Sequence, residues 1–444
     1  MIDFTQKKFG LISLGCDKNR VDAEKLLSRI EERGCTITND IDQANVLIVN
    51  TCSFLEASRR EAIETIIDCA ANRGGNLEKI VVTGCLPQKF IDEVYPALTE
   101  ADMFLGTYDY ELFFEALEKA YAEGRCNMTG MGKDAFYGGR VVTTPLHYAY
   151  LKIADGCSNC CTYCLIPKIR GSYFSHPMEK LVEEAEGLGE LSELILVAQD
   201  VTRYGIDLYG KKSLCELVRR LTALENIASV RLLYCYPEMI DDELIAEVRD
   251  NPKVVKYLDI PFQHSEDRVL KLMNRRGTRA GYLALIEKLR KNIPGIAIRS
   301  TFICGFPTET EEESAALGSF LKQAKLDNCG FFAYSREKGT FAYSMKGQVP
   351  AAEKRRRVKN MYAIQRGISL ERMRSYAGKK LRVLCDGISE ENGCFTGRAY
   401  FSAPDIDGEV LFNAHEAEQG KFYDIYIEDF DEYNLYGRTE DFER

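Results

Sequence analysis

The stretch Tyr148-Ala-Tyr-Leu-Lys-Ile153, followed closely by Gly156-Cys157-Ser-Asn-Cys160-Cys161-Thr-Tyr163-Cys164, decides how the middle of this chain folds. An apolar strand runs into a tight loop of cysteines. Five more strands are predicted, at residues 193–197, 229–234, 255–260, 296–302 and 330–334. Helical stretches separate them, for example at residues 179–187, 213–224, 268–273 and 281–292. Six βα units are fewer than the eight of a closed barrel, so we expect an open, partial (βα)6 barrel with its site at the carboxyl ends of the strands.

The N-terminal part of the chain also alternates between strands and helices. Strands are predicted at residues 9–14, 45–50 and 79–83, and helices at residues 21–32, 57–71 and 109–123. Short apolar strands separated by helices predict a doubly wound parallel sheet with helices on both faces. A cysteine follows the end of each strand, namely Cys16, Cys52 and Cys85. Because sites in such sheets form outside the carboxyl ends of the strands, these three cysteines could converge in space.

The C-terminal part has a different pattern. Beyond a basic helix predicted at residues 354–374, short alternating strands are predicted at residues 380–385, 393–400, 408–412 and 422–428. Their spacing and the turns between them predict a small antiparallel β-barrel. A glycine-rich stretch at residues 129–139 is typical of a linker. We therefore expect three domains, at residues 1–128, 143–375 and 377–444.

Charge is unevenly distributed along the sequence. The chain has 58 Lys and Arg against 68 Asp and Glu, a net charge of −10. Residues 377–444 hold 7 of the basic and 16 of the acidic residues, so this segment alone carries −9. Nucleic-acid binders usually have a basic surface. An acidic terminal barrel should instead repel phosphate and attract a basic protein.

The chain has 16 cysteines and no tryptophan. Its first residues lack the basic-then-apolar pattern of a signal peptide, and no apolar run approaches the roughly 18–20 residues of a membrane span. We therefore expect a cytoplasmic protein without a membrane partner. Cytoplasmic thiols stay reduced, so closely spaced cysteines indicate metal or catalytic sites rather than disulfides.

The cysteine loop has the spacing C-x3-C-x2-C at Cys157, Cys161 and Cys164. Three thiolates so placed can bind three irons of a 4Fe-4S cluster and leave the fourth iron open. An open iron can hold the amino and carboxylate groups of S-adenosylmethionine (SAM), and an electron passed to that ligand can break its carbon–sulfur bond and yield an adenosyl radical. A zinc site usually needs four ligands in paired spacing, and no partner pair follows here. Cys160 is interpreted as a non-ligand.

The cysteine loop resembles that of the radical SAM superfamily. With Cys16, Cys52 and Cys85 before it, the whole chain resembles the methylthiotransferases. This resemblance implies an N-terminal domain in which these three cysteines bind an auxiliary 4Fe-4S cluster. It also implies a central radical SAM barrel, whose 4Fe-4S cluster is held by the loop cysteines, and a C-terminal β-barrel of the TRAM type.

Three stretches resemble the branch of that family that modifies an aspartate of the small-subunit ribosomal protein S-twelve. They are Gly15-Cys-Asp-Lys-Asn-Arg-Val-Asp-Ala-Glu24, Asp259-Ile-Pro-Phe-Gln-His264 and Ala403-Pro-Asp-Ile-Asp-Gly408. The tRNA-modifying members typically have Gln-Met-Asn after the first cysteine. The resemblance implies that one SAM methylates a sulfur held at the auxiliary cluster. A second SAM is cleaved to a radical that takes hydrogen from the aspartate β-carbon, and this carbon then captures the methylthio group.

The resemblance also assigns contacts with SAM at the ends of the barrel strands. The assigned residues are Tyr163 beside the adenine, Gln199 and Asp200 after the second strand, Gln263 after the fourth, and Gly305 in the Gly-Phe-Pro-Thr-Glu-Thr turn after the fifth. Some of these positions have a plainer structural explanation. Tyr163 could be a loop aromatic that shields the cluster, and Asp200 could cap a turn. His264, next to Gln263, could be a structural histidine whose hydrogen bonds are made within the protein. Thr308 replaces the glycine usual in that turn, which weakens any argument for close backbone approach there.

Two other functions are compatible with parts of this pattern. A tRNA methylthiotransferase would share every cluster residue, but it would require a basic TRAM domain because its affinity would come largely from phosphate neutralisation. A non-catalytic iron–sulfur carrier would need the cysteines without a cofactor pocket, and the six-strand barrel argues against it. A radical SAM enzyme also needs an electron donor such as flavodoxin or ferredoxin.

The remaining candidates are interpreted as structural. The run Lys354-Arg355-Arg356-Arg357 is typical of a solvated helix face, with contact to ribosomal RNA as the alternative. The other cysteines are most simply packed thiols, and three histidines have no partners by spacing. These residues are Cys35, Cys69, Cys126, Cys215, Cys235, Cys304, Cys329, Cys385, Cys394, His147, His176 and His415.

Overall fold

The computed structural model describes residues 2–71, 73, 75–132, 138–391 and 393–442. The chain forms two compact units. The first contains residues 1–143, 155–159 and 164–188, and the second contains residues 144–154, 160–163 and 189–444. The chain therefore passes between the units within the predicted cysteine loop. Of the predicted glycine-rich linker, residues 133–137 lie outside the described residues.

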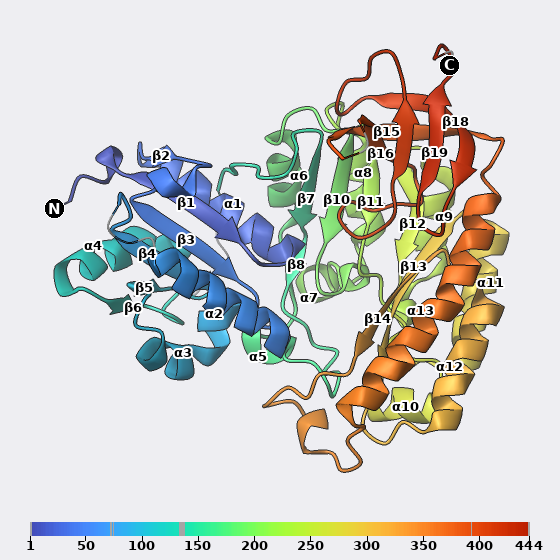
Figure 1. The fold of residues 1–444 in the computed structure, drawn as a ribbon, viewed down its shortest axis with the longest axis horizontal. Coiled ribbons are helices and arrows are strands. Elements are labelled where there is room, and N and C mark those ends of the chain that lie inside the picture. The colour runs from blue at the N-terminus through green and yellow to red at the C-terminus, as the bar shows by residue number, and fades with distance from the viewer. Residues whose placement is uncertain (1, 72, 74, 133–137, 392, 443–444) are drawn as a thin grey trace. The chain divides into compact units, whose positions relative to one another are not determined.

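The first unit is built on a six-stranded parallel sheet (Figure 1). Its strands lie in the order β2 (Thr36–Ile37), β1 (Lys8–Ser13), β3 (Val46–Thr51), β4 (Lys79–Gly84), β5 (Met103–Phe104) and β6 (Cys126–Asn127). The helices that follow the longer strands are α1 (Asp17–Glu32), α2 (Glu56–Ala71) and α3 (Cys85–Ala97), and α4 (Phe113–Glu123) follows β5. The strand order reverses at β1, because β2 lies on one side of it and β3 on the other.

Alternate residues of strand β3 pack on opposite faces of this sheet. Val46 and Ile48 belong to an apolar cluster with residues of α1 and α4, whereas Leu47 and Val49 pack with residues of α2 and α3. Each fully buried aliphatic side chain of this kind contributes about 1.5–3 kcal/mol to folding. Helices on both faces of a parallel sheet confirm the predicted doubly wound fold.

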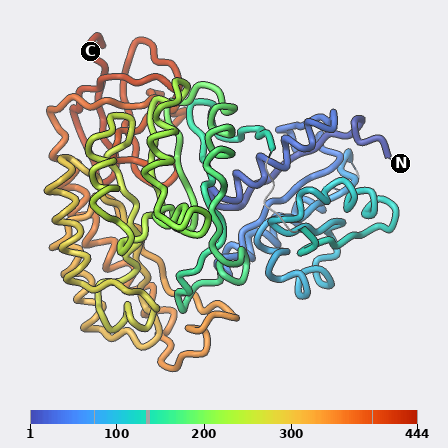
Figure 2. Tube along the Cα trace, turned by 180° about the vertical axis from the view of Figure 1, so that it is seen from behind, coloured from blue at the N-terminus to red at the C-terminus, as the bar shows by residue number. Residues whose placement is uncertain are grey.

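The second unit contains another six-stranded parallel sheet. Its strands lie in the order β14 (Asn328–Ala333), β13 (Ala297–Cys304), β12 (Val254–Asp259), β11 (Val230–Leu232), β10 (Glu193–Val197) and β7 (Tyr148–Lys152). The long helices α8 (Leu214–Thr222), α9 (Asp242–Asp250), α11 (Arg279–Asn292), α12 (Glu311–Ala324) and α13 (Ala351–Arg374) pack along its outer side (Figure 2). The edge strands β7 and β14 do not pair with each other in the described sheet, so the barrel is open and partial, as predicted.

The C-terminal residues of the second unit form a closed five-stranded barrel. Around the barrel the strands are β15 (Lys380–Ser389), β16 (Cys394–Arg398), β17 (Val410–Asn413), β19 (Leu435–Thr439) and β18 (Phe422–Phe430). The small barrel is confirmed, and the structure adds β19 as a fifth strand. Four of its pairs are antiparallel, as predicted, whereas β17 and β19 pair in parallel.

Some elements leave little trace in the sequence pattern. Helix α3 was not predicted, and it contains Pro87 and Pro96 and is kinked at Phe90. Proline inside a helix removes a backbone hydrogen bond, so such a segment does not have a typical helical pattern. Strands β2, β5 and β6 have two residues each, which is too short for periodicity to be recognised. Among the described helices, none has the length and apolar character needed to cross a bilayer.

The C-terminal barrel is attached to the second sheet through a buried charge cluster. Glu193, the first residue of β10, lies 2.7 Å from Arg231 Nε on β11 and also pairs with Arg398 of β16. Burial alone would raise the pKa of Glu193, but the two guanidinium groups lower it to about 2. The carboxylate therefore stays ionised and joins strands from both barrels.

The stretch at residues 403–408 makes a second attachment. Tyr257 of β12 donates a hydrogen bond to Asp407 Oδ2 (2.7 Å), and Arg299 of β13 lies 3.3 Å from Asp407 Oδ1. Glu193 and Arg299 lie in the amino-terminal halves of β10 and β13, as does Asn328 of β14, which donates to the carbonyl of Phe401 (3.0 Å), whereas Tyr257 lies just past the middle of β12. The C-terminal barrel therefore packs at the opposite end of the sheet from the strand carboxyl ends, about 20 Å away for six-residue strands.

Candidate active site

Cys16, Cys52 and Cys85 follow three neighbouring strands of the first sheet. Cys16 is the N-cap of α1, Cys52 directly follows β3, and Cys85 is the first residue of α3. Strands β1, β3 and β4 are adjacent and parallel, so their carboxyl ends lie at one edge of the sheet. This edge includes the point where the strand order reverses, which is the usual ligand-binding position of doubly wound sheets.

Glycines allow these strand ends to approach one another. Gly84 has a φ of +95°, and a Cβ there would lie 2.5 Å from the carbonyl oxygen of Thr51. A Cβ on Gly15 would lie 2.3 Å from the Cβ of Asn19. Because both distances are far shorter than a normal contact, only glycine fits at the positions just before the first and third cysteines.

Asn19 connects the three strand ends. Its Nδ2 donates to the carbonyl of Thr51 (2.9 Å), and its own carbonyl accepts from Asn50 Nδ2 (2.9 Å). Its Oδ1 accepts a hydrogen bond from Cys85 Sγ (3.5 Å). The residue is only 1% exposed, so these bonds are protected from water. Sequence reasoning did not select Asn19, and the only signal was its place in the stretch at residues 15–24.

The thiols of this first set are electrostatic neighbours. Burial raises the pKa of the Cys85 thiol to about 11, Arg170 acts against this increase, and the Cys16 and Cys52 sulfurs add to it. Iron binding requires thiolates, and a bound metal drives their deprotonation. Within the described ranges, no three Cys, His, Asp or Glu side chains converge closely enough to enclose a metal ion. That Cys16, Cys52 and Cys85 bind a cluster together therefore stays a prediction from the sequence.

The cysteine loop at residues 156–164 receives hydrogen bonds at two of its sulfurs. The N–H of Asn159 donates to Cys157 Sγ (3.5 Å), and the N–H of Ile166 donates to Cys164 Sγ (3.4 Å). Hydrogen bonds of this kind favour the thiolate over the neutral thiol. They also tune the potential of a bound cluster. The local backbone thus supports these two cysteines as cluster ligands.

Cys160 and Cys161 lie in the part of the loop that belongs to the second unit. Cys160 is exposed and has a φ of +53°. Near Cys161, the guanidinium of Arg275 lies 4.1 Å above the ring of Tyr236 and is buried. Burial opposes its charge, but the nearby Tyr163 and Cys161 side chains raise the pKa of Arg275. Sequence reasoning missed this permanent cation, which can balance anionic groups at the loop.

Tyr163 lies in an apolar cluster of the second unit. It packs against a buried cluster that includes Met273, Phe306 and Tyr334. Phe306 belongs to the turn that follows β13, so the structure brings the loop aromatic and that turn together. These contacts fit both the proposed position beside an adenine and the plainer role of a shielding aromatic.

Gln199 and Asp200 have different surroundings after β10. Gln199 Oε1 is buried, and within the described part of the chain it has no hydrogen-bond partner. A buried carbonyl of this kind normally has a donor, so it can accept one from a ligand. Asp200 is fully buried and accepts from the N–H of Thr202 (3.1 Å), which caps the turn Val201–Arg203. That bond fits the turn-capping explanation of Asp200.

The turn after β13 is held by close packing. A Cβ on Gly305 would lie 2.4 Å from Cγ of Lys354 on α13, so the glycine is required by this helix. Thr308 adopts a φ of +69°, although it has a side chain where a glycine is usual. Its N–H donates to the carbonyl of Gly347 (2.8 Å), which holds this conformation. Gln263, after β12, also has a positive φ of +72°.

The residues predicted to be structural are largely paired. His264 is fully buried, with Nε2 3.6 Å from Glu309 Oε2. Arg357 lies 2.8 Å from the other oxygen of Glu309, and Arg356 lies 2.7 Å from Glu353. These ion pairs neutralise much of the basic run on α13, which argues against contact with RNA, but Arg357 is buried, so the run is not wholly a solvated helix face.

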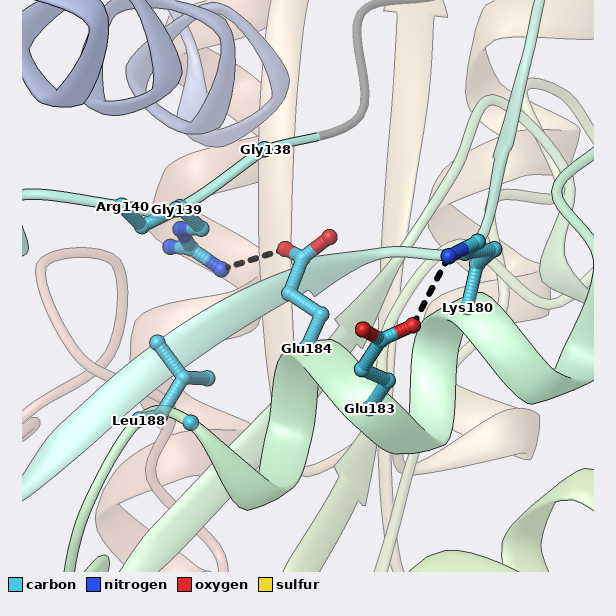
Figure 3. Close-up of a pocket in the computed structure, with 8 residues that line it drawn as sticks. Gly138, Gly139, Arg140, Lys180, Glu183, Glu184 and Leu188 are labelled. Atoms are coloured by element: carbon cyan, nitrogen blue, oxygen red, sulfur yellow. Dashed lines mark hydrogen bonds and ion pairs between the residues drawn. The ribbon is translucent and has the colours of Figure 1, made fainter. Parts of the chain in front are cut away.

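A cavity of about 350 Å³ lies in the first unit beside helix α6 (Met178–Glu186). It is lined by Gly138, Gly139, Arg140, Lys180, Glu183, Glu184, Gly187 and Leu188. Figure 3 shows Arg140 pointing toward Glu184 and Lys180 toward Glu183, with nitrogen–oxygen distances of 3.0 and 2.9 Å. Its charges are thus paired, and the lining described here includes none of the predicted site residues.

Three family models match the chain. They are an uncharacterized protein family, UPF0004, at residues 8–106, the radical SAM superfamily at residues 151–321, and the TRAM domain at residues 377–439. The matches follow the same order as the three segments seen in the sequence.

The chain is similar over nearly its whole length to bacterial proteins named ribosomal protein uS12 methylthiotransferase RimO. It is 44% identical to that of Lachnoclostridium phytofermentans, over 98% of this chain and 100% of the relative. It is 42% identical to that of Acetivibrio thermocellus and 43% identical to that of Trichlorobacter lovleyi, in each case over 98% of both chains.

Two solved structures share the fold at low identity. One is the radical SAM methyltransferase TsrM from Kitasatospora setae, with cobalamin and a 4Fe-4S cluster bound (TM-score 0.53, 15% identity, 74% of this chain and 75% of that chain). The other is the cobalamin-dependent SAM radical enzyme OxsB (TM-score 0.51, 11% identity, 81% of this chain and 56% of that chain). At these identities the likeness concerns the fold alone.

Proposed function

The chain belongs to the RimO family of ribosomal protein uS12 methylthiotransferases, and on that basis we propose that it attaches a methylthio group to the β-carbon of an aspartate of uS12. The observation that carries this proposal is the full-length similarity, 44% over 98% of the chain, in a protein with two separate sets of three cysteines. Enzymes of this family are radical SAM methylthiotransferases that use 4Fe-4S clusters and SAM. The protein is therefore an enzyme.

The two cysteine sets are proposed to hold different clusters. The set at the edge of the first sheet would hold the auxiliary cluster, and the loop set would hold the radical-generating cluster: Cys16, Cys52 and Cys85, and Cys157, Cys161 and Cys164, respectively. When bound, the clusters supply an electron for SAM cleavage and a soft site that stores sulfur for transfer. Electron supply and sulfur storage are different requirements, so it is reasonable that each cluster has its own protein environment.

The surroundings of the loop are proposed to bind SAM and exclude water. The apolar cluster around Tyr163 and Phe306 would cover the adenine side, because radical chemistry needs a pocket without other reactive groups. The unpaired oxygen of Gln199 would accept from a donor on the cofactor, and Arg275 would balance negative charge near Cys161. Gln263 and Gly305 are proposed to contact SAM through their backbone, and Asp200 through the turn that it caps.

The acidic C-terminal barrel is proposed to capture the substrate. Its charge of −9 fits a basic protein such as a ribosomal protein better than tRNA, whose phosphates it would repel. Since this barrel packs at the amino ends of the second sheet, capture and chemistry would occur about one strand length, or 20 Å, apart. The substrate would therefore have to span both surfaces.

We further propose domain boundaries at residues 1–128, 143–375 and 377–444. A small electron-transfer protein such as flavodoxin or ferredoxin is the proposed reductant. A reductant of this kind needs access to the loop cluster, and a partner surface of modest size is sufficient for such brief encounters.

Product analysis in cells tests the proposed substrate. Cells lacking the gene should lose the methylthio mass from uS12, and its return should require the wild-type gene and not the Cys161→Ala variant. tRNA nucleosides from the same cells should be unchanged. If methylthio-adenosine disappears from tRNA while uS12 is unaffected, the tRNA alternative is correct and the proposal is wrong.

A further inference from the structure

Arg170 is a buried cation of the first unit that contacts residues beside the auxiliary cysteines and beside Cys157, and it has no part in the proposed function. It is 2% exposed and caps α5 (Ile166–Ile169), the short helix that follows the cysteine loop. Leu165 and Ile169 of the same segment pack in an apolar cluster with Cys85. The segment that leaves the loop therefore lies directly against one of the proposed auxiliary ligands.

The Arg170 guanidinium contacts two residues of α1 that lie beside the auxiliary cysteines. Its Nη2 donates to Asn19 Oδ1, the same oxygen that accepts from Cys85 Sγ. Its Nη1 lies 2.9 Å from Asp22 Oδ2, one turn further along α1. Arg170 also opposes the effect of burial on the Cys85 thiol, because a nearby cation favours the thiolate. The guanidinium is thus connected to the residue that joins all three strand ends.

The same guanidinium also contacts the residue that precedes the cysteine loop. Nη1 lies 3.2 and 3.0 Å from the two carboxylate oxygens of Asp155, which is fully buried. Asp155 Oδ1 also accepts from the N–H of Gly156, the residue just before Cys157. A Cβ on Gly156 would lie 2.1 Å from the carbonyl oxygen of Ser172, so the backbone there has little freedom. The position of Cys157 is therefore connected to Arg170 through a single carboxylate.

We propose that Arg170 is a positioning residue that holds the auxiliary cysteines and the start of the cysteine loop, at Asp155–Cys157, at a fixed separation and places a buried positive charge beside the auxiliary sulfurs. This inference rests on the proposed function of the two cysteine sets. A planar guanidinium can bind Asn19, Asp22 and Asp155 at once, whereas a lysine ammonium is a compact point charge without that fork. Its charge should raise the reduction potential of a cluster bound beside it, since a buried cation stabilises the more negative, reduced state.

Arg140 provides a matched control for Arg170. Its side chain is 2% exposed in the same unit, and it also pairs with two carboxylates, Glu24 on α1 and Glu184 on α6. If Arg170 is only a structural ion-pair residue, replacing either arginine should have the same kind of effect. If Arg170 is a positioning residue, only its replacement should change the ratio of 5′-deoxyadenosine to product and the potential of the auxiliary cluster.

The test compares Arg170→Lys and Arg170→Met with Arg140→Lys and Arg140→Met after anaerobic reconstitution with iron and sulfide. The first readout is the number of 5′-deoxyadenosine molecules released per methylthiolated uS12. The second is the midpoint potential of the auxiliary cluster, measured by EPR-monitored titration in chains whose three loop cysteines are alanine. Iron content per chain is measured for every sample.

We expect Arg170→Lys to keep its iron and auxiliary potential but to release about tenfold more 5′-deoxyadenosine per product, because a small misplacement between reacting groups has effects of this size or more. Arg170→Met should also shift the potential to more negative values, since Asp22 and Asp155 lose their cation. Both Arg140 variants should keep the wild-type ratio and potential. If Arg170→Met does not retain iron, the inference is tested by the 5′-deoxyadenosine released per methylthiolated uS12 in Arg170→Lys alone.

The inference is overturned if the Arg170 and Arg140 variants have the same 5′-deoxyadenosine ratio and the same auxiliary potential. This outcome is distinguishable from failure of the proposed function. If the proposed function is wrong, wild-type protein gives no methylthiolated uS12 at all. If only the inference about Arg170 is wrong, wild-type protein still forms this product.

Discussion

The two parallel sheets collect their cysteines in opposite ways. In the first sheet, three cysteines distant in the sequence follow three neighbouring parallel strands and therefore lie along one edge. After the first strand of the second sheet, three cysteines lie within eight residues on one loop. The first set depends on the folded sheet and on glycines that let the strands approach, whereas the second depends mostly on local sequence. The sheet-edge set should therefore be far more sensitive to changes in the fold.

The largest expected effect separates the two sets by the step that each one supports. Cys161→Ala should abolish SAM cleavage, because the loop would lose one of only three iron ligands. Cys52→Ala should leave cleavage running and stop sulfur insertion. The measurement is chromatography of 5′-deoxyadenosine together with mass spectrometry of uS12. Methylthiolated uS12 from the Cys52 variant would show that the sheet-edge set is wrongly assigned.

The next effect tests the dependence of the first set on the fold. Gly84→Ala should destabilise the first unit by about 1–3 kcal/mol, because alanine is strained at a positive φ. The new Cβ would also displace the Thr51 carbonyl beside Cys52. We expect the variant to lose the auxiliary cluster and to keep SAM cleavage, as measured by iron content and 5′-deoxyadenosine.

Gly124→Ala is the control for Gly84→Ala. Gly124 follows α4 in the same unit and has a φ of +86°, but a Cβ there meets nothing within 4 Å. It should therefore show the backbone strain without the loss of iron. If both variants lose the auxiliary cluster equally, strain rather than close approach of the strand ends explains the effect.

A smaller effect concerns the amino ends of the second sheet and depends on pH. Burial opposes the charge of Glu193, yet Arg231 and Arg398 lower its pKa from 4.5 to about 2. A lowered carboxylate pKa stabilises the fold above the unfolded pKa, and this stability is lost as the pH falls from 4.5 toward 2. Urea unfolding of wild-type protein should therefore lose free energy across this window.

Glu193→Gln should be less stable than wild type at neutral pH, and the difference should shrink as the pH falls through that window. Glu353→Gln is the control, because the pKa of Glu353 is also lowered to about 2, by hydrogen bonds from Arg356 and Arg357, but at a solvent-accessible site. Solvent screening should make its effect smaller. Equal pH profiles for the two variants would contradict the buried attachment of the C-terminal barrel.

The smallest effect concerns capture of the substrate by the acidic barrel. Glu390→Lys together with Glu391→Lys reverses two exposed charges between β15 and β16. We expect KM for uS12 to rise a few-fold with little change in kcat, because these residues are distant from the strand carboxyl ends. Added salt should raise the wild-type KM in the same direction, since it screens surface charges. If neither the double substitution nor added salt changes the KM for uS12, the acidic barrel does not take part in substrate capture.

Much of the fold could be predicted because its signals are local. The central strands of both sheets are apolar runs between helical stretches, so their positions and the parallel arrangement follow from pattern alone. Helix α3 was missed because of Pro87 and Pro96, and β19 because Leu435–Thr439 lies in a polar, aromatic-rich stretch. The parallel pairing of β17 and β19 depends on long-range contacts, which periodicity does not encode.

The cysteine positions were predictable, but their surroundings were not. A cysteine after a strand and a C-x3-C-x2-C loop can be recognised directly in the sequence. Asn19, Arg170 and Arg275 are ordinary polar residues whose importance depends on what lies next to them in space. Asn19 bonds to residues more than thirty positions away. Such partners become visible only when the strand ends are brought together by the fold.

Iron counting tests the central claim that each cysteine set binds its own cluster. Reconstituted wild-type protein should contain about eight irons per chain, and about four should remain when either set of three cysteines is replaced by alanine. EPR of the two variants should give different signals, and only the variant that retains the loop cysteines should change its signal when SAM is added. Separate clusters on the two cysteine sets are contradicted if replacing either set removes all iron, or if the variant without the sheet-edge cysteines still binds about eight irons.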